Sequence, residues 1–219
     1  MQKKYISFLL SILVCLLLHH SANAQSNFAL QDGDLIFQEA CNGGMSSAIK
    51  EATRGIDGYN FTHVGIVWHK TPEQIYVIEA THPEVTITPL QTYLYPQEKC
   101  TRRSVVGRLK PPYQPLIQSA LQYAKQKVGK KYDDAFDINN DQYYCSELIY
   151  QIFKEANHGQ EVFPLQPMTF KSKDSGEFPE YWVKHFKKMG IPIPEGQPGN
   201  NPGDMSRSEL LNIVHYYDR

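Results

Sequence analysis

Residues 143–150 of the chain read Tyr-Tyr-Cys-Ser-Glu-Leu-Ile-Tyr, and the rest of the sequence is organised around this stretch. From Cys145 onward, apolar residues recur three and four positions apart, as in a helix with one buried face: Leu148, Ile149, Ile152, Phe153 and Ala156. Because the preceding run 137–141 is polar and turn-prone, the pattern places Cys145 in the first turn of this helix. Unpaired backbone N–H groups and the helix dipole favour a thiolate at that position. A lone cysteine on an apolar helix face is more commonly inert packing, so its interpretation depends on the partners that the sequence supplies.

Residues 1–24 have the features of a cleaved secretory signal. Two lysines precede an apolar run over residues 6–18, and residues 22–24 have the small-x-small pattern of a cleavage site. The apolar run is too short for a membrane span, and no small residue precedes Cys15 as it would in a lipid-modified cysteine. We therefore expect a signal peptide followed by one domain over residues 25–219, with no transmembrane anchor, in a secreted or periplasmic protein.

Net charge and the pattern of histidines and cysteines indicate which partners and cofactors to expect. The formal net charge is −1 and no basic stripe is present, so neither nucleic acid nor an anionic membrane is an expected partner. The histidines after residue 24 are scattered without the spacing of a zinc site, and we expect neither a metal nor another cofactor. Among the later cysteines, Cys41 and Cys100 can pair or can both stay free. If they pair, we expect Cys145 to be the unpaired thiol, because a nucleophile must stay reduced.

Several further segments indicate a mixed α and β fold. Runs of β-branched and apolar residues predict short strands over residues 35–37, 61–68, 75–80, 85–88 and 104–109. Apolar periodicity and stop signals predict helices over residues 43–50, 117–128 and 178–189. Residues 190–204 form a loop rich in Gly and Pro. The last stretch, 209–217, is ambiguous, because it follows a capping-box pattern but alternates like a strand.

The second and third predicted strands are close enough in sequence to form an antiparallel hairpin. Because side chains alternate, His63 shares a face with Val67, and Glu79 shares a face with Ile75. If Val67 lies opposite Ile75, the side chains of His63 and Glu79 are directly opposed, about 5 Å apart at Cβ. A slip by one residue would put them on opposite faces. A half-buried histidine or a solvated glutamate is usually unremarkable, but together on one face they indicate a base and its orienting carboxylate.

Cys145, His63 and Glu79 therefore supply a thiol nucleophile, a general base and an orienting group. An attacked carbonyl passes through a tetrahedral oxyanion, which needs a hydrogen-bond donor. The sequence offers the backbone N–H of Cys145 and the hydroxyls of three tyrosines: Tyr132, Tyr143 and Tyr144. For each tyrosine, packing in the core is the more common role.

These motifs resemble the NlpC-type papain-like cysteine peptidases and amidases, and in particular their circularly permuted, YiiX/YebB-like branch. The resemblance rests on the Cys145 motif preceded in the chain by residues 62–67, Thr-His-Val-Gly-Ile-Val, and residues 77–80, Val-Ile-Glu-Ala. It implies an α+β, circularly permuted papain-like fold, with an antiparallel sheet or small barrel packed against the nucleophile helix. It also implies that Tyr132, in a Gly-x-x-Tyr segment, helps to form the oxyanion hole, and that residues 209–217 form a strand.

The resemblance further implies a cysteine peptidase or amidase that hydrolyses an amide bond through Cys145, His63, Glu79 and a thioester intermediate. The expected substrate is a small peptide, a cell-wall peptide derived from peptidoglycan, or an N-acyl amino acid. One alternative is a lipid-directed acyltransferase or esterase of the same superfamily, which a long apolar cleft beside Cys145 would favour. The other is a non-catalytic binding module, favoured if His63 turns away from Cys145 or if residues 190–204 fill the pocket.

Overall fold

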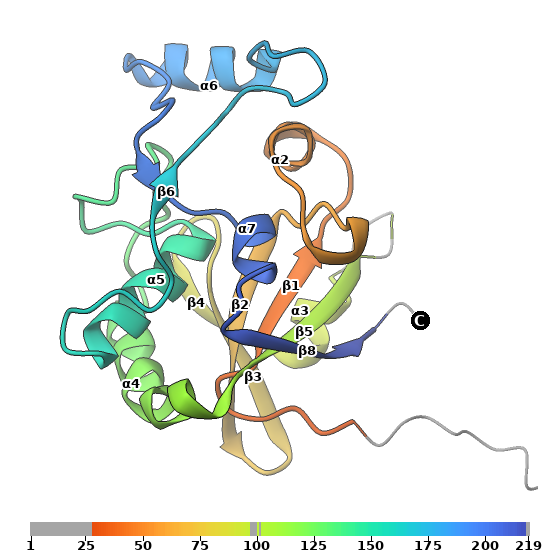
Figure 1. The fold of residues 1–219 in the computed structure, drawn as a ribbon, viewed down its shortest axis with the longest axis vertical. Helices are drawn as coiled ribbons and strands as arrows, with labels where there is room; N and C mark the ends of the chain where they lie inside the picture. Colours follow the sequence, from red (N-terminus) through yellow and green to blue (C-terminus); the bar gives the residue numbers. More distant parts are fainter. Residues whose placement is uncertain (1–27, 97–99, 101, 218–219) are drawn as a thin grey trace, which may run out of the picture.

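A six-stranded antiparallel sheet forms the centre of the fold, in the strand order β4-β3-β2-β1-β5-β8 (Figure 1). The structure is a computed structural model that describes residues 28–96, 100 and 102–217. The expected signal peptide, residues 1–24, lies outside the described residues. Within the described ranges, no helix has both the length and the apolar character needed to cross a membrane.

The strands and long helices follow the segments that the sequence predicts. The sheet contains β1 (Leu35–Glu39), β2 (His63–Thr71), β3 (Gln74–Ala80), β4 (Val85–Pro89), β5 (Arg103–Leu109) and β8 (Leu211–Tyr216). A separate pair is formed by β6 (Gln166–Pro167) and β7 (Pro198–Gly199). The helices are α2 (Gly44–Ala52), α3 (Leu90–Leu94), α4 (Ile117–Lys127), α5 (Cys145–Ala156), α6 (Glu180–Met189) and α7 (Pro202–Ser206), with 3₁₀ turns η1 (Ile56–Gly58) and η2 (Pro111–Leu116). The sequence did not predict α3, α7, η1 or η2, because such short elements give no helical periodicity.

The last strand resolves the ambiguous C-terminal stretch. β8 pairs with β5, and Leu211 lies opposite Leu109. The described strands run from β4 at one edge of the sheet to β8 at the other, so they form an open sheet and not a closed barrel. The α+β class predicted from the sequence is confirmed.

Helices cover both faces of this sheet. On one face, α4 and α5 pack together and bury residues such as Leu148 against Ile66 of β2. Val67, the next residue of β2, points to the other face, where it packs with Leu94 of α3. A third apolar cluster, which includes Trp182, joins α6 to α2 (Figure 1). This cluster lies beyond the sheet and supports one side of the candidate site.

The hairpin of β2 and β3 forms, but its register differs from the predicted one by two residues. Val67 lies opposite Val77 and not opposite Ile75. The connection is tighter than expected, since Thr71 already pairs with Gln74 across the turn. A bulge just before Thr71 then sets the register of the rest of the hairpin.

This correction changes how His63 and Glu79 meet. A shift by two residues keeps every side chain on its face, so the two still share a face, but as diagonal neighbours. Gly65 occupies the intervening position, because a Cβ built on it would lie 3.3 Å from the Cβ of Glu79. The same Cβ would lie 2.4 Å from a methyl carbon of Val77. The missing side chain at Gly65 therefore leaves room for both neighbours.

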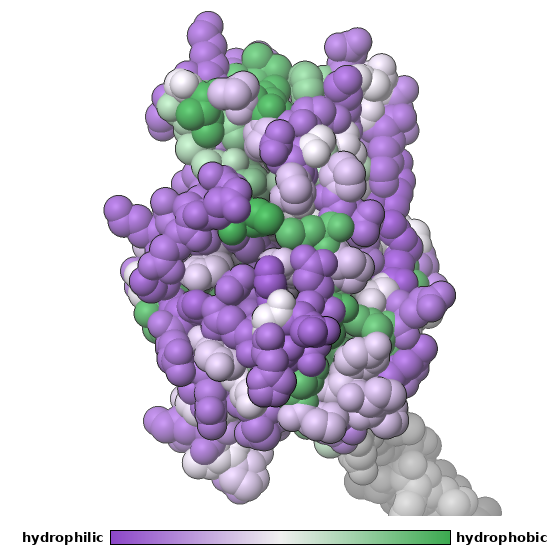
Figure 2. Space-filling view, turned by 60° about the vertical axis from the view of Figure 1, so that its left-hand side comes forward, coloured by the Kyte–Doolittle hydropathy of each residue, from purple (hydrophilic) through white to green (hydrophobic). Residues whose placement is uncertain are grey.

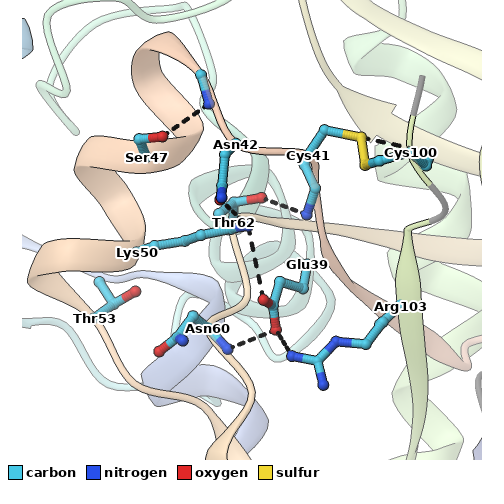
Figure 3. A network of polar contacts seen from close by, with 12 residues as sticks. Glu39, Cys41, Asn42, Ser47, Lys50, Thr53, Asn60, Thr62, Cys100 and Arg103 are labelled. Carbon is cyan, nitrogen blue, oxygen red and sulfur yellow. Dashed lines mark hydrogen bonds and ion pairs between the residues drawn. A yellow bond between two sulfur atoms is a disulfide. The ribbon is translucent and has the colours of Figure 1, made fainter. Parts of the chain in front are cut away.

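A disulfide and a polar network tie α2 to the sheet (Figure 3). Cys41 and Cys100 form the disulfide, with Cα atoms 5.9 Å apart, and Cys145 is free. Glu39, at the end of β1, forms an ion pair with Lys50 of α2 at 3.7 Å and another with an arginine of β5. Of the two pairing states left open by the sequence, the structure has the disulfide.

Replacing Gly65 by alanine should destabilise the protein by about 1–3 kcal/mol, because the added methyl group overlaps Val77. The free energy of unfolding, measured by urea denaturation, tests this. Val77→Ala removes the methyl groups that the added Cβ would overlap. The Gly65→Ala/Val77→Ala double variant should therefore lose less stability than the sum of the losses in the two single variants. A Gly65→Ala protein within about 0.5 kcal/mol of wild type would show that this close approach is absent.

Candidate active site

Cys145 is the first residue of α5, as the sequence predicts, and is only 5% exposed. Tyr144 precedes the helix in an extended conformation, and its N–H donates to Oε2 of Glu147 at 3.1 Å. Burial raises the pKa of Glu147 to about 9, although this N–H contact lowers it, so the carboxyl group is neutral at pH 7. The first turn of α5 therefore carries no negative charge from Glu147 near the Cys145 thiol at pH 7.

His63 is the first residue of β2 and is held by a carboxylate. Its Nε2 lies 2.5 Å from Oε2 of Glu79. The other carboxylate oxygen, Oε1, accepts a hydrogen bond from the hydroxyl of Thr88 on β4 at 2.5 Å. Because Nε2 is engaged with Glu79, Nδ1 is the nitrogen left for the Cys145 thiol. Three neighbouring strands thus fix the orientation of one imidazole.

The surroundings of His63 favour its protonated form. Burial by itself lowers the pKa of His63, but interaction with the Cys145 side chain, together with the hydrogen bond and charge of Glu79, raises it to about 10. Burial raises the pKa of Glu79, but the hydrogen bond and charge of His63 outweigh it and lower this pKa below its usual value. At neutral pH the arrangement is an imidazolium held between a sulfur and a carboxylate.

The structure separates the three tyrosines that the sequence offers as oxyanion donors. The hydroxyl of Tyr143 donates to Asp141 at 3.2 Å, and Tyr143 is not among the described residues that line the cleft beside the thiol. Tyr144 does line it, but its hydroxyl accepts the backbone N–H of Asn200 at 3.2 Å. That bond ties two segments of the chain together, so Tyr144 has a structural role.

Tyr132 lines the cleft together with Cys145. Its N–H donates to the carbonyl of Pro83 at 3.0 Å, and its ring packs against that of His82 at an interplanar angle of 33°, with centroids 4.0 Å apart. The hydroxyl contacts a weak acceptor, the thioether sulfur of Met45, at 3.8 Å. Burial, and then the nearby Cys145 sulfur, raise the pKa of Tyr132 well above its ordinary value, so the phenol stays a hydrogen-bond donor.

A cleft opens beside Cys145, with an envelope of about 530 Å³ that includes open solvent at its entrance. Its walls come from the start of α5, from α2 and α6, and from the stretches 168–170 and 200–202. Apolar side chains dominate these walls: Ile49, Phe136, Met168, Phe170 and Trp182. Figure 1 shows α6 beyond α2 at one end of the molecule, and Figure 2 shows apolar surface gathered at that end. The late Gly- and Pro-rich segment is ordered and forms part of one wall; it does not fill the cleft.

Sequence reasoning missed Thr88 and the aromatic walls of the cleft. Thr88 could have been found by extending the alternation argument to the next strand, because it pairs with Val77 and so lies diagonal to Glu79. Phe136 and Trp182 gave no such signal. Phe136 lies in the loop before α5 and Trp182 lies well after it, and the packing of α6 in the third apolar cluster brings the two rings together.

Comparison with known proteins identifies the family. A family model described as "Permuted papain-like amidase enzyme, YaeF/YiiX, C92 family" matches residues 29–215. The chain belongs to this family. The open antiparallel sheet with α5 packed against it is therefore the YaeF/YiiX form of the permuted papain-like fold, as the motifs implied.

Two YiiX proteins are similar to this member of the YaeF/YiiX family. The uncharacterized protein YiiX of Escherichia coli strain K12 is 36% identical over 128 residues. That match spans 58% of this chain and 58% of the relative. A crystal structure of metalloprotein YiiX from Escherichia coli O157:H7 has a TM-score of 0.68 and 28% identity, and the match covers 86% of this chain and 98% of that one.

Replacing Glu79 by glutamine should lower the pKa of His63 from about 10, because the hydrogen bond and charge of the carboxylate are removed while burial and the interaction with Cys145 remain. Histidine NMR signals followed across pH, with His63 assigned from a His63→Ala spectrum, measure this. Glu73→Gln is the matched control, since it removes an exposed carboxylate from the turn of the same hairpin. Equal titration of His63 in the Glu79→Gln and wild-type proteins would rule out the coupling.

Proposed function

We propose that this protein is a secreted cysteine hydrolase that cleaves an amide bond through Cys145, His63 and Glu79. The observation that carries the proposal is the clamped imidazole, with Glu79 on Nε2 and Nδ1 left for a thiol at the mouth of a cleft. Membership of a family described as amidases supports an amide substrate. The substrate is a small peptide or an N-acyl amino acid, for which peptidoglycan is one source.

In the first half of the reaction, the Cys145 thiolate attacks the carbonyl carbon of the amide, and the C=O electron pair moves onto oxygen. Tyr132 and the backbone N–H of Cys145 donate hydrogen bonds to this oxyanion. When the oxyanion collapses, the C–N bond breaks and the leaving amine takes the proton from the His63 imidazolium. The acyl group remains on sulfur as a thioester.

In the second half, neutral His63 removes a proton from water, and the resulting hydroxide attacks the thioester carbonyl. The C–S bond breaks, the carboxylic acid product leaves, and the thiolate–imidazolium pair is restored. Glu79 keeps the imidazole in place and stabilises its positive charge in both halves. Thr88, which donates to Glu79, acts only by positioning that carboxylate.

The geometry bears on the alternatives that the sequence left open. A non-catalytic binding module is disfavoured, because His63 interacts with Cys145 and the cleft is open. A lipid-directed acyltransferase or esterase is the second candidate, because the apolar cleft walls beside Cys145 also suit an acyl chain. Both candidates share the thioester and differ in the acyl group that the cleft accepts.

Two further features bear on the setting of the reaction. The disulfide between Cys41 and Cys100 supports an oxidising compartment and hence secretion or a periplasmic location. The solved YiiX relative is called a metalloprotein, but within the described ranges of this chain no group of three or more His, Cys, Asp or Glu side chains is placed to hold a metal ion. The proposed steps therefore use the chain's own groups.

Cys145→Ala and Cys145→Ser should each reduce turnover by at least ~10³-fold, because neither side chain replaces the thiolate. Stability should stay within about 1 kcal/mol of wild type, since both substitutions are small. Mass spectrometry of peptidoglycan fragments and N-acyl amino acids after incubation with wild type and Cys145→Ala provides the readout. Products that form equally with both proteins would remove Cys145 from the reaction.

Tyr132→Phe should lower kcat by about 10²-fold with a smaller effect on KM, because an oxyanion donor acts mainly in the transition state. Steady-state kinetics on a substrate found by the mass-spectrometric screen measures the effect. Tyr123→Phe, on α4, is the matched control and should leave both constants near wild type. An unchanged kcat in Tyr132→Phe would leave the backbone N–H as the main donor.

A further inference from the structure

Backbone hydrogen bonds hold the main chain of Tyr132 close to the start of α5. The N–H of Tyr132 donates to the carbonyl of Pro83 at 3.0 Å, and Tyr132 forms a parallel β-bridge with Tyr143. Within this bridge, the N–H of Tyr143 donates to the carbonyl of Lys131 at 3.1 Å. Because Tyr143 shortly precedes Cys145, these bonds fix the Tyr132 backbone relative to the thiol. They leave the side-chain torsions of Tyr132 undetermined.

The ring of His82 packs against the ring of Tyr132. The ring centroids are 4.0 Å apart at an interplanar angle of 33°. The His82 side chain is 55% exposed, so it covers Tyr132 from the solvent side, while residues of the core pack against Tyr132 from within. The Tyr132 hydroxyl contacts the sulfur of Met45, which is too weak an acceptor to fix the ring by itself. The contact with His82 therefore constrains where the hydroxyl points.

The His82 imidazole is itself held in place. Its Nε2 lies 2.9 Å from Oδ1 of Asp134, which follows Tyr132 closely in the chain. The backbone of Asp134 is fixed in turn, because its carbonyl accepts a hydrogen bond from Nε2 of His185 on α6 at 2.8 Å. The Tyr132 ring is thus packed against an imidazole whose orientation is set by the segment that carries Tyr132.

His82 lies in the connection between β3 and β4, and this hairpin also carries Glu79 and Thr88. Thr88 donates to the Glu79 carboxylate, which holds the His63 imidazole. The start of β4 is bonded to the segment that precedes Tyr132, since the N–H of Val85 donates to the carbonyl of Lys130 at 2.8 Å. One hairpin therefore contacts both the general base and the phenol that donates to the oxyanion in the proposed reaction.

We propose that His82 is a positioning residue for Tyr132, and that its imidazole, held by Asp134, keeps the phenol hydroxyl directed at the oxyanion. His82 is not among the described residues that line the cleft, so it acts through Tyr132 and not on the substrate. This role rests on the proposed function, in which Tyr132 donates a hydrogen bond to the oxyanion.

His82→Ala should lower kcat by about tenfold and leave KM within about twofold, because a displaced oxyanion donor is felt mainly in the transition state. His82→Phe restores an aromatic ring without the bond to Asp134 and should return kcat to within about threefold of wild type. His69→Ala is the matched control. Its Nδ1 also lies 2.9 Å from an aspartate oxygen, on Asp32, but His69 is toward the other end of β2. A loss confined to KM, or a His82→Phe protein as slow as His82→Ala, would overturn the assigned role.

A double variant tests whether His82 acts through the Tyr132 hydroxyl. In the Tyr132→Phe background the hydroxyl is absent, so adding His82→Ala should lower kcat by less than about twofold further. Losses that multiply in the double variant would show that His82 acts on another group and would overturn the inference.

Crystal structures of wild type, His82→Ala and His82→Phe separate this inference from the proposed hydrolysis, because they need no substrate. We expect the Tyr132 hydroxyl to move by about 1 Å or more, or to occupy two orientations, in His82→Ala, and to keep its wild-type position in His82→Phe. A hydroxyl that stays in place in His82→Ala would overturn the inference, whether or not an amide is hydrolysed. A displaced hydroxyl with unchanged kcat would support the positioning role and would instead remove Tyr132 from the proposed reaction.

Discussion

The contact between His63 and Glu79 depends on three neighbouring strands of the sheet. It needs β2 and β3 in one register, Gly65 between the two side chains, and Thr88 on β4 to hold the second carboxylate oxygen.

The charge on this pair also contributes to the stability of the fold. Because the pKa of His63 is raised in the folded protein, protonation of His63 stabilises the fold fully below about pH 6.5, and this stabilisation is lost as pH rises through about 10. Because the pKa of Glu79 is lowered, its ionised carboxylate stabilises the fold above about pH 4.5, and this stabilisation is lost as pH falls through the pKa of Glu79 in the folded protein. Both contributions are present at neutral pH.

The sulfur reaches this pair from the opposite half of the chain. α5 packs against the sheet through its buried face, and that packing carries Cys145 to the start of β2. Because the groups meet through helix-on-sheet packing, their order along the chain is free to change. In this chain, which belongs to a permuted family, the strand that carries His63 comes before the helix that carries Cys145.

The cleft beside Cys145 is assembled from other elements than those that hold His63 and Glu79. Its walls belong to α2, α6 and two connecting segments, which pack into their own apolar cluster beyond the sheet. The disulfide and the Glu39 ion pairs hold α2 to β1 and β5, so one wall is anchored to the strands that surround His63 (Figure 3). This division allows the cleft walls to change without moving the thiol or the imidazole.

The sequence by itself determined the local features of this protein. The apolar spacing after Cys145 gave the helix and its start, and strand alternation put His63 and Glu79 on one face, because both patterns follow from backbone geometry. The family motifs singled out Tyr132 in advance, and the structure then gave Tyr143 and Tyr144 other partners. Tertiary structure alone decided the rest. A bulge sets the register of the hairpin, and no short sequence motif predicts it. The closeness of two loops in space decides that Cys41 pairs with Cys100. The cleft depends on Phe136, Trp182 and Asn200 meeting across long separations in the chain, which periodicity cannot reveal because it reports only neighbours on one element.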